Sequence, residues 1–167
     1  EIAVVAGYQA VGRGMVMNGT GTNVGGWAGS VAYKTIMPQL KACFPSDLQA
    51  VIKSTTLYTD NTGNQQTAAS AVTANNNEVY YLAEYEVFGI NSRANTNEPA
   101  QQAQYDYYKA GNSKVKYRSN KTGSTTEWWL RSPYRSDVYS FCNVSVSGTI
   151  GTVNANTSYG SAPCLQQ

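Results

Sequence analysis

The sequence predicts a mixed α+β fold in which two helices pack on small antiparallel sheets and long loops connect the elements. One observation is a helix-favouring stretch that begins at Trp27. Another is a series of short runs rich in β-branched and aromatic residues, such as Val79–Phe88, which is typical of strands. Gly-, Asn- and Thr-rich stretches such as 18–26 separate these runs and indicate loops. With 167 residues and no internal repeat of fixed period, the chain is expected to form one domain spanning 1–167.

The N-terminal part should contain strands followed by helices. Glu1–Val16 alternates apolar and small residues, which predicts one or two strands. The helix-favouring stretch extends over Trp27–Leu40. Ser46 is followed three residues later by Gln49, a spacing that predicts a capping box, so a second short helix is expected over Ser46–Ile52.

The middle of the chain is more varied. Asp60–Asn77 is polar without periodicity, which indicates an exposed excursion. Val79–Phe88 is expected to be one buried strand. Gln101–Ala110 should form a short helix that stops at Gly111. After Trp128, short strands should alternate with turns.

Composition excludes several classes of partner. Charged residues make up 13% of the chain and the formal net charge is +2, with Lys and Arg spread along the sequence, so no nucleic-acid partner is expected. No apolar run reaches the length of a membrane-spanning helix, so this domain is not expected to insert into a membrane. The chain has no histidine, which removes the commonest general base and the commonest metal ligand.

The cysteines and carboxylates give little support for a metal site. Cys43, Cys142 and Cys164 lack CxxC spacing, which argues against zinc. Three free, half-buried thiols are favoured over a disulfide between Cys142 and Cys164, because a buried cysteine behaves as a small hydrophobic residue. The ten carboxylates form no Asp-x-Asp loop, so calcium also has little support. We therefore expect no metal and no cofactor.

Glu84 and Glu86 are the strongest candidates for catalysis. A strand would place this pair on one face, where paired carboxylates could serve a carbohydrate-processing enzyme. The favoured alternative is structural: a buried carboxylate that caps loop amides or pairs with Arg131. Because nothing else in the chain completes a catalytic constellation, we expect no enzyme.

The segment Tyr134–Gly160 has an unusual composition. It contains no Lys, Glu, Gln, Met or Trp, whereas all of its residue types can be reached from an asparagine codon by changing only the adenines. It follows the bulky block Trp128–Pro133 and carries Tyr, Ser, Gly and Asn, which are typical of adaptable binding surfaces. A Ser/Thr/Gly-rich region that is simply polar is the alternative reading.

Ten short segments occur in a specific order along most of the chain. They are Gly25–Trp27, Pro45–Leu48, Val51–Lys53, Leu57–Asp60, Glu84–Gly89, Gln104–Tyr108, Asn112–Tyr117, Trp128–Pro133, Phe141–Val144 and Ala162–Pro163. With them the chain resembles bacterial and phage surface domains that end in a WWLRSP-type segment. It also resembles the variable proteins of diversity-generating retroelements, whose C-terminal repeat is rewritten by adenine-specific mutagenesis. The terminal Cys164–Gln167 departs from the pattern, which has a more apolar last strand.

The resemblance implies a C-type-lectin-like fold, of the branch related to formylglycine-generating enzyme. The oxidase activity of that branch is not carried over, because its active-site cysteine pair has no match here. The implied function is a hypervariable ligand-binding domain for receptor recognition or adhesion, with a variable segment at about 134–160. The implied partner is a cell-surface protein or glycan, and the implied location is extracellular, on a bacterial surface or a phage virion. A structural virion or surface module is a further alternative.

Residue by residue, the resemblance assigns two roles. Scaffold residues are Trp128, Trp129, Arg131 and Phe141. Ligand-binding, variable positions are Tyr134, Arg135, Asp137, Val138, Tyr139, Ser140, Ser145, Val146, Ser147, Thr149, Gly151, Thr152, Val153, Asn154, Asn156, Thr157 and Tyr159.

A displayed face also requires a pattern of burial. Since strand neighbours point to opposite sides, some side chains of the segment should face the core while others converge on one exposed patch. The expected inward set is Phe141, Val144, Ala155 and Ala162. The expected outward set is Tyr139, Ser145, Ser147, Thr152, Asn154 and Tyr159.

Overall fold

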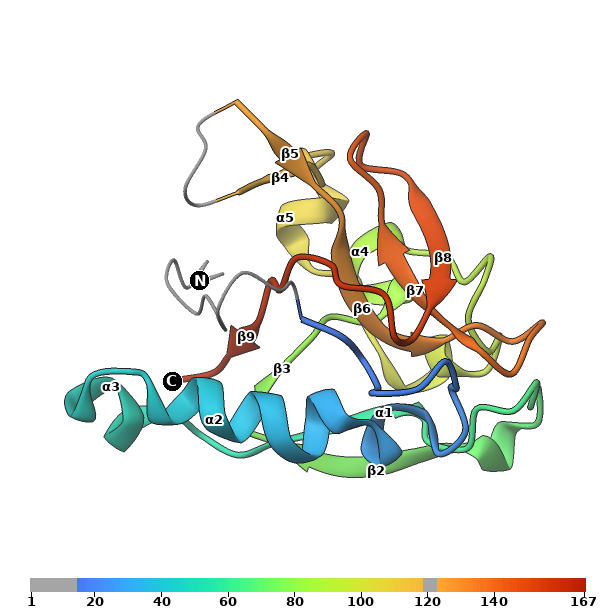
Figure 1. The fold of residues 1–167 in the computed structure, drawn as a ribbon, viewed down its shortest axis with the longest axis horizontal. Helices are drawn as coiled ribbons and strands as arrows, with labels where there is room; N and C mark the ends of the chain where they lie inside the picture. Colours follow the sequence, from blue (N-terminus) through green and yellow to red (C-terminus); the bar gives the residue numbers. More distant parts are fainter. Residues whose placement is uncertain (1–14, 119–122) are drawn as a thin grey trace.

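The computed structural model describes residues 15–118 and 123–167. Helical elements form the first part of this chain and run along one side of the molecule (Figure 1). They are α1 (Gly26–Gly29), the π-helix η1 (Ala32–Ile36), α2 (Met37–Ala42) and α3 (Ser46–Val51). Later short helices are η2 (Ala69–Ala71), α4 (Glu84–Phe88), η3 (Glu98–Gln101) and α5 (Asp106–Lys109).

The described strands form four small antiparallel sheets. Three are two-stranded: β1 (Thr55–Asp60) with β2 (Val72–Asn77), β3 (Val79–Tyr80) with β9 (Cys164–Leu165), and β4 (Lys116–Tyr117) with β5 (Thr125–Thr126). The fourth has the order β6 (Trp128–Pro133), β7 (Ser140–Val144), β8 (Ile150–Asn154). The predicted α+β class is confirmed at this level.

The strand β6 lies at the centre of the core. All of its residues are buried, and it contacts α1, β1, α4 and β7. Each buried indole finds a hydrogen-bond acceptor: Trp27 Nε1 donates to Asn77 Oδ1 (2.8 Å), Trp128 Nε1 to the Lys114 carbonyl oxygen (2.9 Å), and Trp129 Nε1 to the Met15 carbonyl oxygen (2.7 Å). Burying a tryptophan is favourable when its N–H is satisfied in this way.

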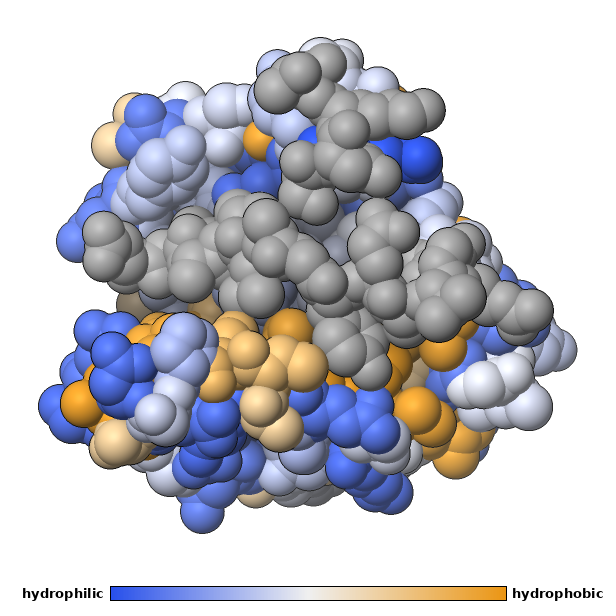
Figure 2. All heavy atoms as spheres, turned by 60° about the vertical axis from the view of Figure 1, so that its left-hand side comes forward, coloured by the Kyte–Doolittle hydropathy of each residue, from blue (hydrophilic) through white to orange (hydrophobic). Residues whose placement is uncertain are grey.

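Figure 2 shows the face on the left of Figure 1. Hydrophobic atoms lie in a band across its lower part, while the upper part, at the height of β4, β5 and α5, is mostly hydrophilic. Within the described residues, no helix is both long enough and apolar enough to cross a membrane.

The predicted capping box at Ser46 is wrong, although the helix there exists. Ser46 is the first residue inside α3, so Pro45 holds the cap position and no side chain caps the helix. The Gln49 side chain instead donates to the Phe44 carbonyl oxygen (2.7 Å). Pro45 suits this place because its fixed φ and missing N–H are tolerated where a helix begins.

The predicted strand Val79–Phe88 is wrong after Tyr80. Residues 84–88 form α4, whose start is capped by the Glu86 carboxylate, since Oε2 accepts the Ala83 N–H (2.8 Å). Gly89 ends the helix with φ of 70°, a left-handed conformation that favours glycine. Local capping here overrides the strand propensity of the apolar and aromatic residues.

Two other predicted elements also change, and a third is mostly untested. Asp60–Asn77 is not simply an exposed excursion, because 72–77 pairs with β1 along six residues. Within Gln101–Ala110 only α5 is α-helical. The expectation for Glu1–Val16 lies mostly outside the described residues, and Met15 forms a β-bridge with Tyr159.

Candidate functional site

The segment 134–160 forms a hairpin with loops at both ends (Figure 1). The loop 134–139 and the chain after Asn154 lie at one end, and the turn 145–149 lies at the other. Five residue pairs join β7 and β8, from Ser140 with Asn154 to Val144 with Ile150, so the two ends are about 14 Å apart. The candidate positions thus form two groups connected by β8, rather than the one compact patch that we expected.

The inward half of the expected burial pattern is confirmed. Phe141, Val144 and Ala155 are fully buried, and Ala162 is buried as well. The scaffold residues Trp128, Trp129 and Arg131 are also buried. These side chains fix the backbone of the hairpin against the core.

The outward half is mixed. Tyr139 is 55% exposed, and Ser147 and Asn154 are exposed, while Ser145 and Thr152 are half-buried. Tyr159 instead packs on Trp129, with ring centroids 5.3 Å apart. Of the other candidates, exposed positions are Val146, Thr149 and Asn156, half-buried positions are Tyr134, Arg135, Asp137, Val138, Gly151, Val153 and Thr157, and Ser140 is buried.

Three candidate positions are constrained by their surroundings. The Asp137 carboxylate accepts the N–H groups of Tyr139 (2.8 Å) and Ser140 (2.7 Å) and the Ser140 hydroxyl (2.7 Å). A Cβ at Gly151 would lie 2.7 Å from Asn143 Oδ1, so a larger residue there has little room. Asp137, Ser140 and Gly151 therefore shape the loop and the hairpin, and their assignment as variable positions stays a prediction.

Asn23 holds the loop 134–139 from the side of the protein interior. It is fully buried, and its Nδ2 lies within hydrogen-bond distance of three carbonyl oxygens: Tyr134 (3.2 Å), Asp137 (2.9 Å) and Ser140 (3.0 Å). Its backbone N–H donates to the Val138 carbonyl oxygen (2.9 Å). Sequence analysis missed Asn23, because an asparagine in a Gly/Thr/Asn loop carries no local signal of burial.

A first support loop, 61–66, contacts the same region. The Asn64 N–H donates to Asn23 Oδ1 (2.9 Å), and Gln65 Nε2 donates to the Ser136 carbonyl oxygen (3.0 Å). Gly63 has φ of 58°, and a Cβ there would collide with the Asn23 carbonyl oxygen. The close approach of these two backbones requires glycine.

A second support loop, 92–94, is organised by Glu84. This fully buried carboxylate accepts the N–H groups of Ser92 (2.9 Å), Arg93 (3.0 Å) and Ala94 (2.5 Å). The loop in turn accepts two bonds from Arg135, at the Arg93 carbonyl oxygen (3.1 Å) and the Ala94 carbonyl oxygen (3.0 Å).

Glu86 pairs with Arg131 in the core. The two carboxylate oxygens each accept a guanidinium N–H at 2.6 Å. Arg131 also donates to Thr59 Oγ1 (2.7 Å) and to the Tyr81 carbonyl oxygen (2.8 Å). Both structural roles expected for the carboxylate pair are therefore present, one in Glu84 and one in Glu86. The expected shared strand face is wrong, because α4 directs the two groups to different partners.

Two further buried carboxylates were missed by sequence analysis. Asp60 Oδ1 accepts the N–H groups of Thr62 and Gly63, both at 2.9 Å, and so orders the first support loop. Glu98 accepts the Asp60 N–H (3.0 Å) and the Ser132 hydroxyl (2.8 Å). Burial raises the pKa of Glu98 to about 7 and also raises the pKa of Asp60.

The cysteines are free, as favoured from the sequence, but none of them is half-buried as expected. Cys142 and Cys164 are buried and Cys43 is exposed. Burial raises the pKa of Cys164 to about 12, so this thiol stays protonated at neutral pH. Among the residues that the structure describes, no three His, Cys, Asp or Glu side chains cluster as a metal site would require.

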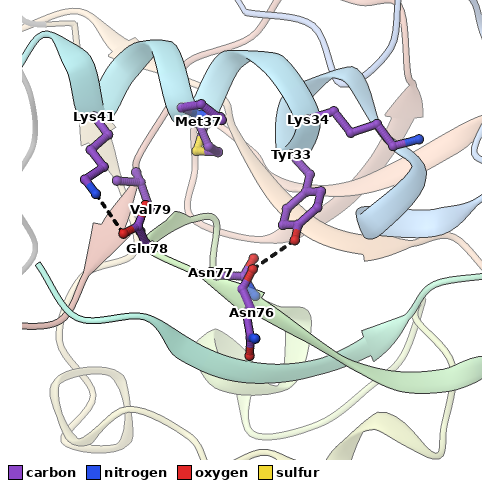
Figure 3. A pocket seen from close by; sticks show the side chains of 9 residues that line it. Tyr33, Lys34, Met37, Lys41, Asn76, Asn77, Glu78 and Val79 are labelled. Carbon is purple, nitrogen blue, oxygen red and sulfur yellow. Dashed lines mark hydrogen bonds and ion pairs between the residues drawn. The ribbon is translucent and has the colours of Figure 1, made fainter.

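A cavity of about 390 Å³ lies away from the hairpin, between η1 and α2 on one side and β2 and β3 on the other (Figure 3). Met37 and Val79 contribute apolar lining. At its rim, Lys41 Nζ and Glu78 Oε1 are 2.7 Å apart, and the Tyr33 hydroxyl donates to the Asn76 carbonyl oxygen (2.9 Å). Its lining carries no pair of adjacent carboxylates of the kind that hydrolyse glycosides.

Comparison with known proteins gives one family. Residues 14–166 match a family described as a domain of unknown function, DUF6273. No curated protein and no solved structure matches the chain. Since the match covers almost the whole sequence, including the helices, β6 and the entire hairpin, the chain belongs to the DUF6273 family.

Proposed function

We propose that this domain is a hypervariable ligand-binding module with a C-type-lectin-like fold, of the kind diversified by retroelements. The observation that carries the proposal is how the loop 134–139 is held. Asn23 and Gln65 donate to the carbonyl oxygens of Tyr134, Ser136, Asp137, Val138 and Ser140, that is, to backbone atoms. Apart from Asp137 and Arg135, whose side chains bond other parts of the site, side chains on this loop can change while these supports remain, which is what a diversified surface requires.

The side chains on the hairpin fit a binding role. Tyr139 is 55% exposed and Val146 is 47% exposed, and both stand among Ser, Thr and Asn residues. Tyrosine supplies a large contact area with few rotatable bonds, and small polar residues supply adaptable hydrogen bonds. The ligand in this proposal is a protein or glycan on a cell surface, and the domain acts outside the cell on a bacterial surface or a phage virion.

The lectin-like part of the proposal has its own support. The buried WWLRSP strand runs through the centre of the core, short helices flank the small sheets, and long loops project beside the hairpin. The C-terminal strand β9 returns to pair with β3 in the middle of the chain.

Sequencing the coding locus in many isolates tests the diversification directly. We expect substitutions at Tyr134, Val138, Tyr139, Thr149, Thr152 and Asn156, a nearby reverse-transcriptase gene, and an invariant template copy whose adenines align with these codons. Uniform substitution along the chain, or a locus without template and reverse transcriptase, would contradict the proposal.

A library tests the physical requirement. Simultaneous randomisation of the same six positions should leave most variants folded, because none of the six side chains is buried and surface substitutions usually change stability by less than about 0.5 kcal/mol each. A matched library at six supporting positions (Asn23, Asp60, Gly63, Glu84, Asp137, and Asn95, whose side chain donates to Asp60 Oδ2 at 3.3 Å) should yield few folded proteins. Equal folded fractions, measured by protease resistance on a display host, would count against the division into display and support.

The alternative of a carbohydrate-processing enzyme has a simple test. A glycan-hydrolysis screen that detects turnover in the wild type, lost in Glu84→Gln or Glu86→Gln variants that remain folded, would favour the enzyme. The bonding of both carboxylates within the protein favours the binding module.

A further inference from the structure

Four basic residues lie in or next to α5 and β4, within ten consecutive positions of the chain. Lys109 ends α5, Lys116 lies in β4, and Lys114 and Arg118 are two residues before and after Lys116. We call these four residues the basic strip. Over residues 15–118 and 123–167, the ion pairs join Lys41 to Glu78 and Arg131 to Glu86, so no member of the strip has a carboxylate partner there.

Burial of acidic groups makes the surface more basic than the composition suggests. The carboxylates of Asp60, Glu84, Glu86 and Glu98 are buried, whereas Arg131 is the buried cation among the described residues. The net charge of +2 is therefore a sum of a formally negative interior and a more positive surface. A surface with an excess of positive charge attracts an anionic partner.

Two members of the strip are partly buried over aromatic rings. Lys114 Nζ lies 5.5 Å from the ring centroid of Phe88 and 5.9 Å from that of Tyr108, and Lys116 Nζ lies 5.6 Å from that of Trp128. Burial lowers the pKa of Lys116. The rings hold these ammonium groups in place, and groups that have already lost water gain more from an anion than fully hydrated ones.

The strip adjoins one end of the hairpin. A Cβ at Gly148 would lie 3.3 Å from Val115 Cγ2 and 3.5 Å from Lys114 Cβ, so the turn 145–149 packs against the strip. On this turn the hydroxyl oxygens of Ser145, Ser147 and Thr149 lie 2.7 to 3.3 Å from one another. Such hydroxyls can exchange hydrogen bonds with the hydroxyls of a sugar.

We propose that the basic strip and the hydroxyl cluster of the 145–149 turn together bind an acidic polysaccharide, a chain of sugars that carries carboxylate groups. The proposal rests on the proposed function, because it gives a ligand class to one end of the same face. Hydroxyl groups beside ammonium groups suit a hydroxylated polyanion, and Tyr117, 58% exposed in β4, offers a ring for stacking. Four cations, with the exposed Asp106 in the first turn of the same α5 that Lys109 ends, fit such a polymer better than the dense phosphates of a duplex.

Polygalacturonate is the probe, with dextran as a neutral polymer and duplex DNA as a competing polyanion. Calorimetric titration of the whole domain should detect polygalacturonate binding that weakens between about 50 and 200 mM salt, and no dextran binding. The double variant K109Q/R118Q should weaken binding at least about tenfold, since it removes two exposed charges from the strip. A second variant pair, S147A and T149A, should weaken binding without changing its salt dependence.

The matched control is K34Q/K53Q, which removes the same charge from exposed positions elsewhere. It should change the affinity by less than about threefold, because those residues lie outside the strip. An equal loss in both double variants, tighter binding of DNA than of polygalacturonate, or no polygalacturonate binding would each overturn the proposal.

The two proposals fail separately. If the hairpin codons vary among isolates but polygalacturonate does not bind, the proposed ligand class is wrong and the display function still stands. If polygalacturonate binding depends on the basic strip but the locus does not vary, the diversification is wrong and the polysaccharide site still stands.

Discussion

At the scale of single residues, the buried polar side chains decide the shape of the candidate face. Asn23 shows how one amide can hold a loop without restricting its sequence, because its acceptors are backbone carbonyl oxygens. Glu84 and Asp60 act in the same way on the two support loops, through backbone N–H groups.

Asn23→Asp should destabilise the protein by at least about 2 kcal/mol, because it removes the donor and places a carboxylate against three carbonyl oxygens. Amide hydrogen exchange should accelerate first in residues 134–140. The control Asn156→Asp, at an exposed position of the same segment, should shift stability by less than about 0.5 kcal/mol. Equal exchange rates along 134–140 in wild type and Asn23→Asp would show that the amide does not hold the loop.

The Glu86–Arg131 pair gives a second prediction at this scale. Glu86→Leu should destabilise the fold by about 3–5 kcal/mol, because it leaves a fully buried guanidinium without its counter-charge. The double variant Glu86→Leu/Arg131→Met should recover part of this loss, since no uncompensated charge remains. Chemical denaturation of the wild type, of both single variants (Glu86→Leu and Arg131→Met) and of the double variant gives the coupling energy. A double variant less stable than Glu86→Leu would mean that other bonds of Arg131, to Thr59 and Tyr81, matter more than the pair.

At the scale of elements, the three-stranded sheet combines a fully buried strand with a partly exposed edge strand. Every residue of β6 is buried, whereas β8 is an edge strand whose residues are half-buried or exposed. β7 lies between them and pairs with both, so the edge strand β8 is anchored to the core through β7.

Trp129→Ala should cost roughly 3–5 kcal/mol, because it empties a fully buried site on β6. Simultaneous replacement of Thr149, Thr152 and Asn156 by alanine should cost less than about 1.5 kcal/mol. Thermal melting of both variants checks the difference. Comparable melting shifts would contradict the contrast between β6 and the hairpin.

At the scale of the whole molecule, the buried acids link stability to pH. The pKa of Glu98 rises from 4.5 to about 7 on folding, because burial disfavours the charged form. The folded state therefore binds this proton more tightly than the unfolded chain. The contribution of Glu98 to stability is complete below pH 4.5 and is lost as the pH rises to about 7. The raised pKa of Asp60 acts in the same direction.

The difference in unfolding free energy between wild type and Glu98→Gln should therefore change by about 3 kcal/mol between pH 4.5 and pH 8. The chain contains no histidine, so no side chain with an ordinary pKa near neutrality obscures the trend. Urea denaturation at several pH values measures it. Parallel pH profiles for the two proteins would mean that Glu98 titrates at its ordinary pKa.

The sequence alone predicted the α+β class and the scaffold role of Trp128, Trp129, Arg131 and Phe141, and it favoured free thiols and a structural role for Glu84 and Glu86. These expectations follow from local composition, from the burial of bulky apolar groups, and from the rule that a charge is rarely buried without a partner. It also marked 134–160 as distinct, because composition is visible without a fold.

Only the tertiary structure decided which residues support that segment. The pairing of β1 with β2, the helix at Glu84–Phe88, and the meeting of Asn23, Gly63 and Ser140 join positions far apart in the chain. Buried hydrogen bonds of this kind depend on loop closure, and the residues that make them look, in sequence, like any polar loop residue. For the same reason Asp137 and Ser140 read as variable surface until their mutual bond placed them in the frame of the loop.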